Sequence, residues 1–192
     1  MNQKHYSRLL SLGSLLGALM IAGAAQAQSN VYPIAVSADV VASASAGQVI
    51  MDIFNGAAHG NFGWMTWTGD TTEAALVTSL TGAGNASTYI NPDTSNNEQL
   101  AVGDWVLGKL GVSNNINVRD ALDALEDNEI ILPVWDQVRG SGPTLAYHIS
   151  GFAKVQIKGY RLPGQSRITV LFLGVFDNPS GDDGGGDGGP GV

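Results

Sequence analysis

The spacing of apolar residues predicts two long β-strands in the C-terminal half of the chain. The first spans residues 147–160, where apolar side chains on one face alternate with charged or polar side chains on the other. The inward positions are Ala153, Val155 and Ile157, and the outward positions are Lys154, Gln156 and Lys158. The second strand spans residues 167–176 and is apolar at most positions, which predicts a strand covered on both faces.

A different period predicts the helices. The clearest lies over residues 115–127, where apolar residues follow the i, i+3, i+4, i+7 rule of an amphipathic helix. These residues are Val118, Ala121, Leu122 and Leu125. An asparagine at position 115 or 117 can cap this helix, and we expect its apolar face to pack on strand residues 153–157 and 168–172. A shorter helix is predicted over residues 72–80.

The remaining segments predict shorter strands and loops. Residues 31–53 suggest one or two strands, and the glycine-bounded residues 60–70 suggest another, with Trp64 on one face and Trp67 on the other. In residues 130–135, Pro133 lacks a backbone N–H and therefore favours an edge strand or a bulge. Residues 81–98 have the composition of a polar loop. The fold class predicted from these elements is α+β, mostly an antiparallel β-sheet or small barrel with one or two short helices.

The two ends of the chain differ from the middle. Residues 1–27 contain two cations, an apolar run and the sequence Ala25-Gln26-Ala27, which together predict a cleaved secretory signal peptide. We expect one globular domain over residues 28–177 and a flexible, Gly- and Asp-rich acidic tail over residues 178–192. The expected location is therefore secreted or periplasmic, with no membrane span after the signal is removed.

Composition narrows the possible partners. The formal net charge is −8, and residues 28–108 hold no lysine or arginine, so a nucleic-acid partner is not expected because phosphate binding needs clustered cations. The chain has no cysteine and no H-E-x-x-H or other clustered ligand spacing. The sequence accordingly predicts no metal site and no cofactor.

One stretch raises the question of catalysis. Val-Trp-Asp-Gln-Val-Arg-Gly-Ser-Gly at residues 134–142 is followed within ten residues by His148, which brings Asp136, Arg139, Ser141 and His148 close in sequence. A secreted hydrolase that uses Asp136 and His148 is one hypothesis. The stretch lacks the G-x-S-x-G motif of a nucleophile elbow. We favour a strand entering a surface turn, with Asp136 and Arg139 paired across the turn.

The four tryptophans offer a second kind of site. An exposed tryptophan near polar side chains can stack on a sugar ring, whereas a buried one fills the core. Trp64 is the one we expect to be exposed, because Thr66 shares its face of the strand. Trp64 and Trp135 are therefore candidate carbohydrate-binding residues, together with Asp136, Arg139 and His148 as neighbouring polar groups.

Three stretches carry a resemblance to a known module. They are GNFGWMTWTGD, VGDWVLGKLGVSNNINVRDALDAL and ILPVWDQVRGSGPTLAYHISGFAKVQIKGYRLPGQSRITVLFLG, within residues 60–70 and 101–174. This pattern of glycine, tryptophan and strand residues resembles an uncharacterised extracytoplasmic module of Tad-type (Flp) pilus-assembly proteins and short secreted relatives. The resemblance implies a role at the cell surface or in pilus assembly and brings no catalytic signature.

The hypothesis that follows is an exported, non-catalytic structural or adhesive module whose partner is a cell-surface protein or a glycan. Two alternatives stay open at this point. One is the hydrolase that uses Asp136 and His148, and the other is a carbohydrate-binding module that uses an exposed tryptophan.

Overall fold

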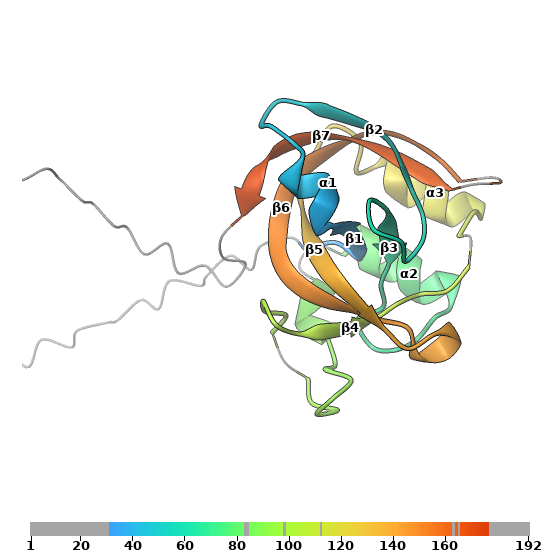
Figure 1. The fold of residues 1–192 in the computed structure, drawn as a ribbon. Coiled ribbons are helices and arrows are strands. Elements are labelled where there is room, and N and C mark those ends of the chain that lie inside the picture. Colours follow the sequence, from blue (N-terminus) through green and yellow to red (C-terminus); the bar gives the residue numbers. More distant parts are fainter. Residues whose placement is uncertain are drawn as a thin grey trace, which may run out of the picture.

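The chain folds as an α+β structure built on one open β-sheet (Figure 1). This computed structural model describes residues 31–82, 85–97, 99–111, 113–162, 164 and 166–176. The signal peptide predicted at residues 1–27 and the acidic tail predicted at 178–192 lie outside the described residues. The predicted fold class is confirmed, but the alternative of a small barrel is not, because the sheet does not close on itself.

Seven strands and three α-helices make up the described fold. The strands are β1 (Ile34–Ser37), β2 (Val49–Phe54), β3 (Phe62–Trp64), β4 (Trp105–Leu107), β5 (Glu129–Arg139), β6 (Ala146–Arg161) and β7 (Arg167–Phe176). The helices are α1 (Ala38–Ala42), α2 (Glu73–Thr81) and α3 (Ile116–Asp123), with 3₁₀ turns at η1 (Asn85–Thr88) and η2 (Gly142–Thr144).

The sheet has the strand order β2-β7-β6-β5-β1-β3, and β4 pairs with β6. Neighbouring strands are antiparallel except for β1 and β5, which run parallel. Strand β6 is the longest, and it pairs with both β5 and β7 as the three curve together across the molecule (Figure 1). These three strands form the frame on which the other elements pack.

The centre of the sheet is buried on both faces. Strand β1 shows this directly, because Ile34 and Val36 belong to one hydrophobic cluster while Ala35 belongs to a second. Side chains alternate between the two faces of a strand, so the two clusters lie on opposite sides of the sheet. Strand β5 divides in the same way, with Leu132 in the first cluster and Ile131 in the second.

Helix α3 covers the first of these clusters, as its periodicity predicts. Asn115 caps it, with the side-chain oxygen Oδ1 accepting a hydrogen bond from the Val118 backbone N–H at 2.9 Å. Leu122 and Leu125 are buried in the same cluster as the inward residues of β6 and β7, which confirms the packing expected for them. The helix ends at Asp123, four residues before the predicted end.

Three details of the structure differ from the predicted elements. The segment 31–53 holds the predicted strands, β1 and the start of β2, but also helix α1 between them; Ser37 caps α1, and its side chain accepts a hydrogen bond from the Asp39 N–H. Strand β5 is not an edge strand, because β6 and β1 flank it, although its pairing with β6 does shift at bulges that begin after Val134. Pro133 is accommodated where β1 leaves a gap in its parallel pairing. Strand β7 is fully buried on one face only, since Thr169 and Leu171 on the other face are only partly buried.

Two bulges lie close together in the pairing of β5 with β6, and each shifts the register of that pairing. Val134 pairs with Gly151 and Gln137 pairs with His148, but Trp135 pairs with Ile149 in between. Ser150 is therefore the extra residue on β6, and Asp136 is the extra residue on β5. A bulge reverses the alternation of side chains beyond it. Beyond these bulges, Tyr147 and Val138 face the second cluster.

Tyr147 occupies space that two glycines leave open. Its ring is buried against Trp135, with ring centroids 5.4 Å apart. A Cβ atom at Gly63 would lie 2.4 Å from the Tyr147 ring, and one at Gly108 would lie 2.9 Å from it. Burial raises the pKa of Tyr147 to about 12.

The packing of α3 predicts a large loss of stability for Leu122→Ala. Leu122 is fully buried, and truncating a buried leucine removes contacts and leaves a cavity, which costs ~2–5 kcal/mol. Denaturant unfolding of both proteins measures this difference. An unfolding free energy within about 0.5 kcal/mol of wild type, as for a surface position, would contradict the packing described here.

The burial of Tyr147 predicts a loss of stability at alkaline pH. Its pKa is about 12 in the folded protein against 10.0 for a free tyrosine, so above pH 10 the unfolded chain releases a proton that the folded chain keeps. The stabilisation is thus complete below pH 10 and is lost as pH rises through about 12, a change on the order of 2–3 kcal/mol. Unfolding free energies measured across this interval should fall less steeply for Tyr147→Phe. Burial and a hydrogen bond to Asp123 also raise the pKa of Tyr160, and this contributes equally to both proteins.

Candidate functional site

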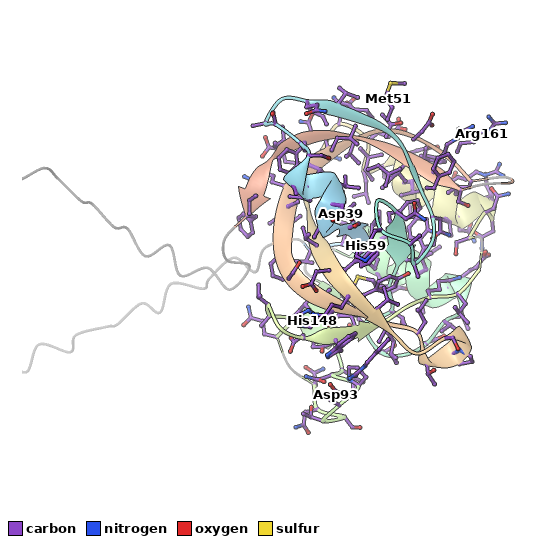
Figure 2. The ribbon with its side chains drawn as sticks, viewed as in Figure 1. Asp39, Met51, His59, Asp93, His148 and Arg161 are labelled. Atoms are coloured by element: carbon purple, nitrogen blue, oxygen red, sulfur yellow. The ribbon has the colours of Figure 1, made fainter. Side chains whose placement is uncertain are left out.

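The candidate site lies on the outer face of β4, β6 and β5 beyond the two bulges. Val106 and Tyr147 face the second hydrophobic cluster there, so their neighbours Trp105 and His148 point to the other side of the sheet. Trp105 and Gln137 both pair with His148, which places His148 between them in the sheet. Figure 2 shows His148 and Asp93 at the end of the molecule near β4, away from Met51 and Arg161. We call this region the outer β4–β6–β5 surface.

Asp136 and His148 form a close pair on this surface. Asp136 Oδ1 lies 2.6 Å from His148 Nδ1, and the two side chains are 37% and 24% exposed. Asp136 reaches His148 because it is the extra residue of the β5 bulge, next to the residue that pairs with His148. The carboxylate can orient the imidazole ring and leaves Nε2 directed elsewhere.

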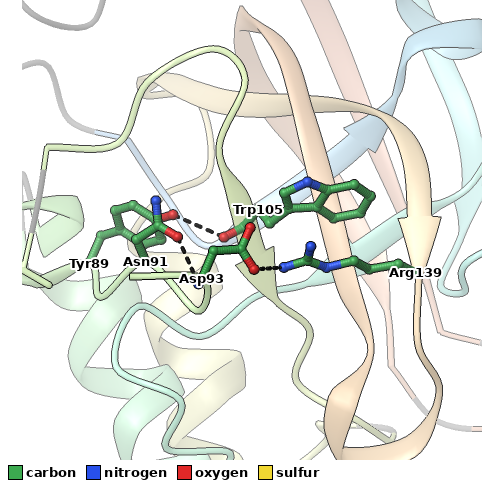
Figure 3. Close-up of polar contacts among 5 residues, drawn as sticks. All are labelled: Tyr89, Asn91, Asp93, Trp105 and Arg139. Carbon is green, nitrogen blue, oxygen red and sulfur yellow. Dashed lines mark hydrogen bonds and ion pairs between the residues drawn. The ribbon is translucent and has the colours of Figure 1, made fainter. Parts of the chain in front are cut away.

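Arg139 is held by two other groups. Its guanidinium lies over the Trp105 ring, 4.3 Å from the ring centroid, and Nη2 donates to Asp93 Oδ1 (Figure 3). The predicted ion pair between Asp136 and Arg139 is therefore wrong, because each has a different partner. Arg139 pairs with Asp93 because the fold places the loop that carries Asp93 beside β4 and the end of β5.

The loop that carries Asp93 is itself fixed in place. The Asp93 backbone N–H donates to Asn91 Oδ1 at 2.9 Å, and the Tyr89 hydroxyl donates to the Trp105 carbonyl at 2.9 Å (Figure 3). Tyr89 is fully buried in the second hydrophobic cluster, so the loop is attached to the core. Asp93 thus meets Arg139 from an anchored segment.

A pocket with a volume of ≈ 520 Å³ lies beside Arg139, between this loop and the turn that joins β5 to β6. Apolar and polar groups share its lining. The apolar side chains belong to Ile90, Pro92, Leu107, Pro143 and Ala146, and the polar ones to Thr68, Asn91, Ser95, Arg139 and Thr144. The volume and mixed lining are those of a small-molecule site with a few placed polar groups.

The outer surface does not assemble a hydrolytic triad among the described residues. His148 forms its side-chain hydrogen bond with Asp136, and no serine or threonine hydroxyl of the described chain hydrogen bonds to it. The Ser150 hydroxyl donates to the Val134 carbonyl at 3.3 Å, and Ser141 lies in the η2 turn. Asp136 and His148 are therefore brought together as the sequence suggests, whereas Ser141 is not.

The prediction that Trp64 is exposed is wrong. Trp64 is 1% exposed and Trp135 is 0% exposed, so neither can present a face to a sugar ring. The third fully buried tryptophan is Trp67. The two strands that carry Trp64 and Trp135 are covered on both faces. Sharing a strand face with Thr66 therefore does not bring Trp64 to the surface, and Thr66 is itself buried. Trp105 is half-buried and borders the site instead.

Sequence reasoning missed Asp93 and Trp105. Asp93 lies in a segment read only as a polar loop, and its one local signal is the Asn-Pro-Asp sequence at 91–93, which favours a turn. Trp105 carries no local signal that distinguishes it from the three buried tryptophans. No periodicity links either residue to Arg139.

Two other classes of feature are absent from the described residues. No group of three or more histidine, aspartate or glutamate side chains is placed to hold a metal ion. None of the helices in this part of the chain has the length and apolarity to cross a membrane.

The geometry around the η2 turn predicts how much substitutions at residues 140–142 lower the unfolding free energy. Gly140 has φ +70°, and a Cβ there would lie 2.2 Å from the Thr144 carbonyl oxygen, whereas Gly142 has φ +54° with open space around it. We expect Gly140→Ala to lower the unfolding free energy by about 1–3 kcal/mol. Gly142→Ala should cost less, and the exposed Ser141→Ala less than about 0.5 kcal/mol.

Thermal and denaturant unfolding of the three variants would measure this order. If Ser141→Ala instead removed an activity while leaving the melting temperature unchanged, the interpretation of this segment as a structural turn would be wrong.

Comparison with known proteins adds one partial likeness. No family model matches the chain, and no solved structure matches it. Over 104 residues, or 53% of its length, the chain is 34% identical to an erythronate-4-phosphate dehydrogenase of Pseudomonas fluorescens. The match spans 27% of that relative, so the chain covers about a quarter of the dehydrogenase.

Proposed function

We propose that the protein is an exported, non-catalytic adhesive module that binds a neutral glycan in the pocket beside Arg139. The observation that carries the proposal is this pocket of ≈ 520 Å³, bounded by an arginine whose position is fixed from two sides. A pre-positioned donor loses little freedom on binding, which favours affinity.

Arg139 keeps donors for a ligand while it contacts Asp93. A guanidinium has five N–H donors, and the contact with Asp93 uses Nη2. The Trp105 ring supports the flat face of the group, which leaves its edge available for hydroxyl oxygens. Arg139 therefore lines the pocket as an oriented donor rather than as a free charge.

The lining chemistry supports a sugar. Sugar rings have apolar C–H faces and polar edges, and the pocket offers proline and aliphatic surfaces beside hydroxyl, amide and guanidinium groups. A neutral glycan is favoured because the chain carries a formal net charge of −8, which repels polyanions. Trp64 and Trp135, the tryptophans proposed for this purpose from the sequence, take no part.

The location and partner are supported by the sequence. The cations, apolar run and Ala25-Gln26-Ala27 of the first 27 residues favour export, and the resemblance to Tad-type pilus-assembly modules favours a cell-surface role. A surface polysaccharide, alone or on a cell-surface protein, is the partner that fits both.

Binding can be tested with fragments of neutral glucans, mannans and galactans. Isothermal titration should find at least one that binds, and Arg139→Met should weaken it by about tenfold. The melting temperature should change little, because an exposed ion pair such as Arg139–Asp93 contributes only ~0–1 kcal/mol. Arg161→Met is the matched control, since Arg161 lies at the other end of the molecule (Figure 2).

Two results would refute this function. One is that no neutral glycan of the panel binds, and the other is that Arg139→Met and Arg161→Met bind equally well.

The close Asp136–His148 pair favours one second candidate, a secreted hydrolase. A carboxylate that orients a histidine is part of many hydrolytic sites, although here no nucleophile hydrogen bonds to His148 within the described chain. Screening against ester, glycoside and peptide substrates separates the two functions. Turnover that disappears in a folded His148→Ala variant would establish the hydrolase and reject the non-catalytic module.

A further inference from the structure

Lys109 is a buried cation that the proposed function does not use. It follows β4, and its backbone N–H donates to the Trp64 carbonyl at 2.8 Å, which fixes the residue against the core. The residue is only 8% exposed. Its side chain borders a pocket of ≈ 230 Å³ between the segment after β3, helix α2 and the η1 turn. This pocket shares only Thr68 with the pocket beside Arg139.

The Lys109 ammonium has no direct partner in the described part of the chain. It forms no hydrogen bond there and lies within 4.0 Å of no described carboxylate. Burial lowers the pKa of Lys109, and the charge of Glu73 opposes this effect from a greater distance. The Glu73 carboxylate accepts a hydrogen bond from Asn115 Nδ2 instead. A lysine that is largely withdrawn from water and has no carboxylate within 4.0 Å is unfavourable, so the pocket is suited to a ligand that supplies a counter-ion.

The rest of the lining indicates what kind of anion fits. Met65, Ala75 and Leu76 give the pocket an apolar wall, while threonine and serine hydroxyls surround the remainder. Asp70 also borders the pocket, and hydrogen bonds from Thr72 lower its pKa, so it stays ionised and repels a multiply charged anion. The volume corresponds to roughly seven or eight water molecules. These features favour one negative charge on a short apolar body.

We propose that this pocket binds a small aliphatic monocarboxylate, with its carboxylate on Lys109 and its hydrocarbon chain against Met65, Ala75 and Leu76. The site is separate from the glycan pocket and does not rest on the proposed function. Lys109 acts as the counter-ion, and the α2 side chains set the permitted chain length.

Titration of the full chain with sodium butyrate at neutral pH tests the proposal. Methyl resonances of Met65, Ala75 and Leu76 should shift saturably, and n-butylamine and inorganic phosphate should not reproduce the shifts. Lys109→Met should weaken butyrate binding by about tenfold or more, because the methionine side chain keeps the apolar volume of lysine but lacks its charge. Lys154→Met is the control, since Lys154 is a half-exposed lysine with a partner in Glu129.

A second pair of variants leaves the charge in place. Ala75→Leu fills the pocket and should abolish butyrate binding, whereas Ala74→Leu adds the same atoms on the exposed side of α2 and should not. Circular dichroism and melting curves check that the variants fold. No saturable shift in the wild-type protein, equal binding of n-butylamine, or unchanged binding in Lys109→Met and Ala75→Leu would each overturn the site.

Discussion

The structure depends on burying the centre of one sheet on both faces. Strands β1 and β5 send alternate side chains into two separate hydrophobic clusters, and each cluster needs its own cover. Helices α2 and α3 supply side chains to one cluster, and the segments around Tyr89 and Leu100 supply them to the other. The segment between α2 and β4 is therefore attached to the core at Ala86, Tyr89 and Leu100, and this anchors Asp93 beside Arg139.

The tryptophans illustrate how this constraint limits function. Trp64, Trp67 and Trp135 are fully buried, and their indole N–H groups reach no hydrogen-bond acceptor among the described residues. Leaving a buried donor unsatisfied costs about 1–3 kcal/mol, so these rings are held by packing rather than by polar contacts. The residues that face outward at the site are instead Trp105, Arg139 and His148, which lie where one face of the sheet is uncovered.

The sequence predicts the elements whose pattern is local. Period-two alternation identifies β6 and β7, and the i, i+3, i+4 spacing identifies α2 and α3. The sequence does not predict which faces of the sheet are buried, because the residues that cover them are distant in the chain. For the same reason Trp64 is wrongly expected at the surface, Arg139 is assigned the wrong partner, and Lys109 attracts no notice. The Asp136–His148 contact is the part of the site that proximity in sequence does indicate.

The paired bulges at Asp136 and Ser150 have a consequence for how this protein can vary in length. Each adds one residue to its own strand, and together they restore the register, so Arg139 still pairs with Ala146 at the hairpin end. Deleting either residue would remove its own bulge and leave the pairs on both sides of it in register, with Tyr147 still facing the second cluster. The two bulges can therefore be lost independently in related chains. A chain that lacks the β5 bulge would keep the strand pairing but lose the carboxylate that contacts His148.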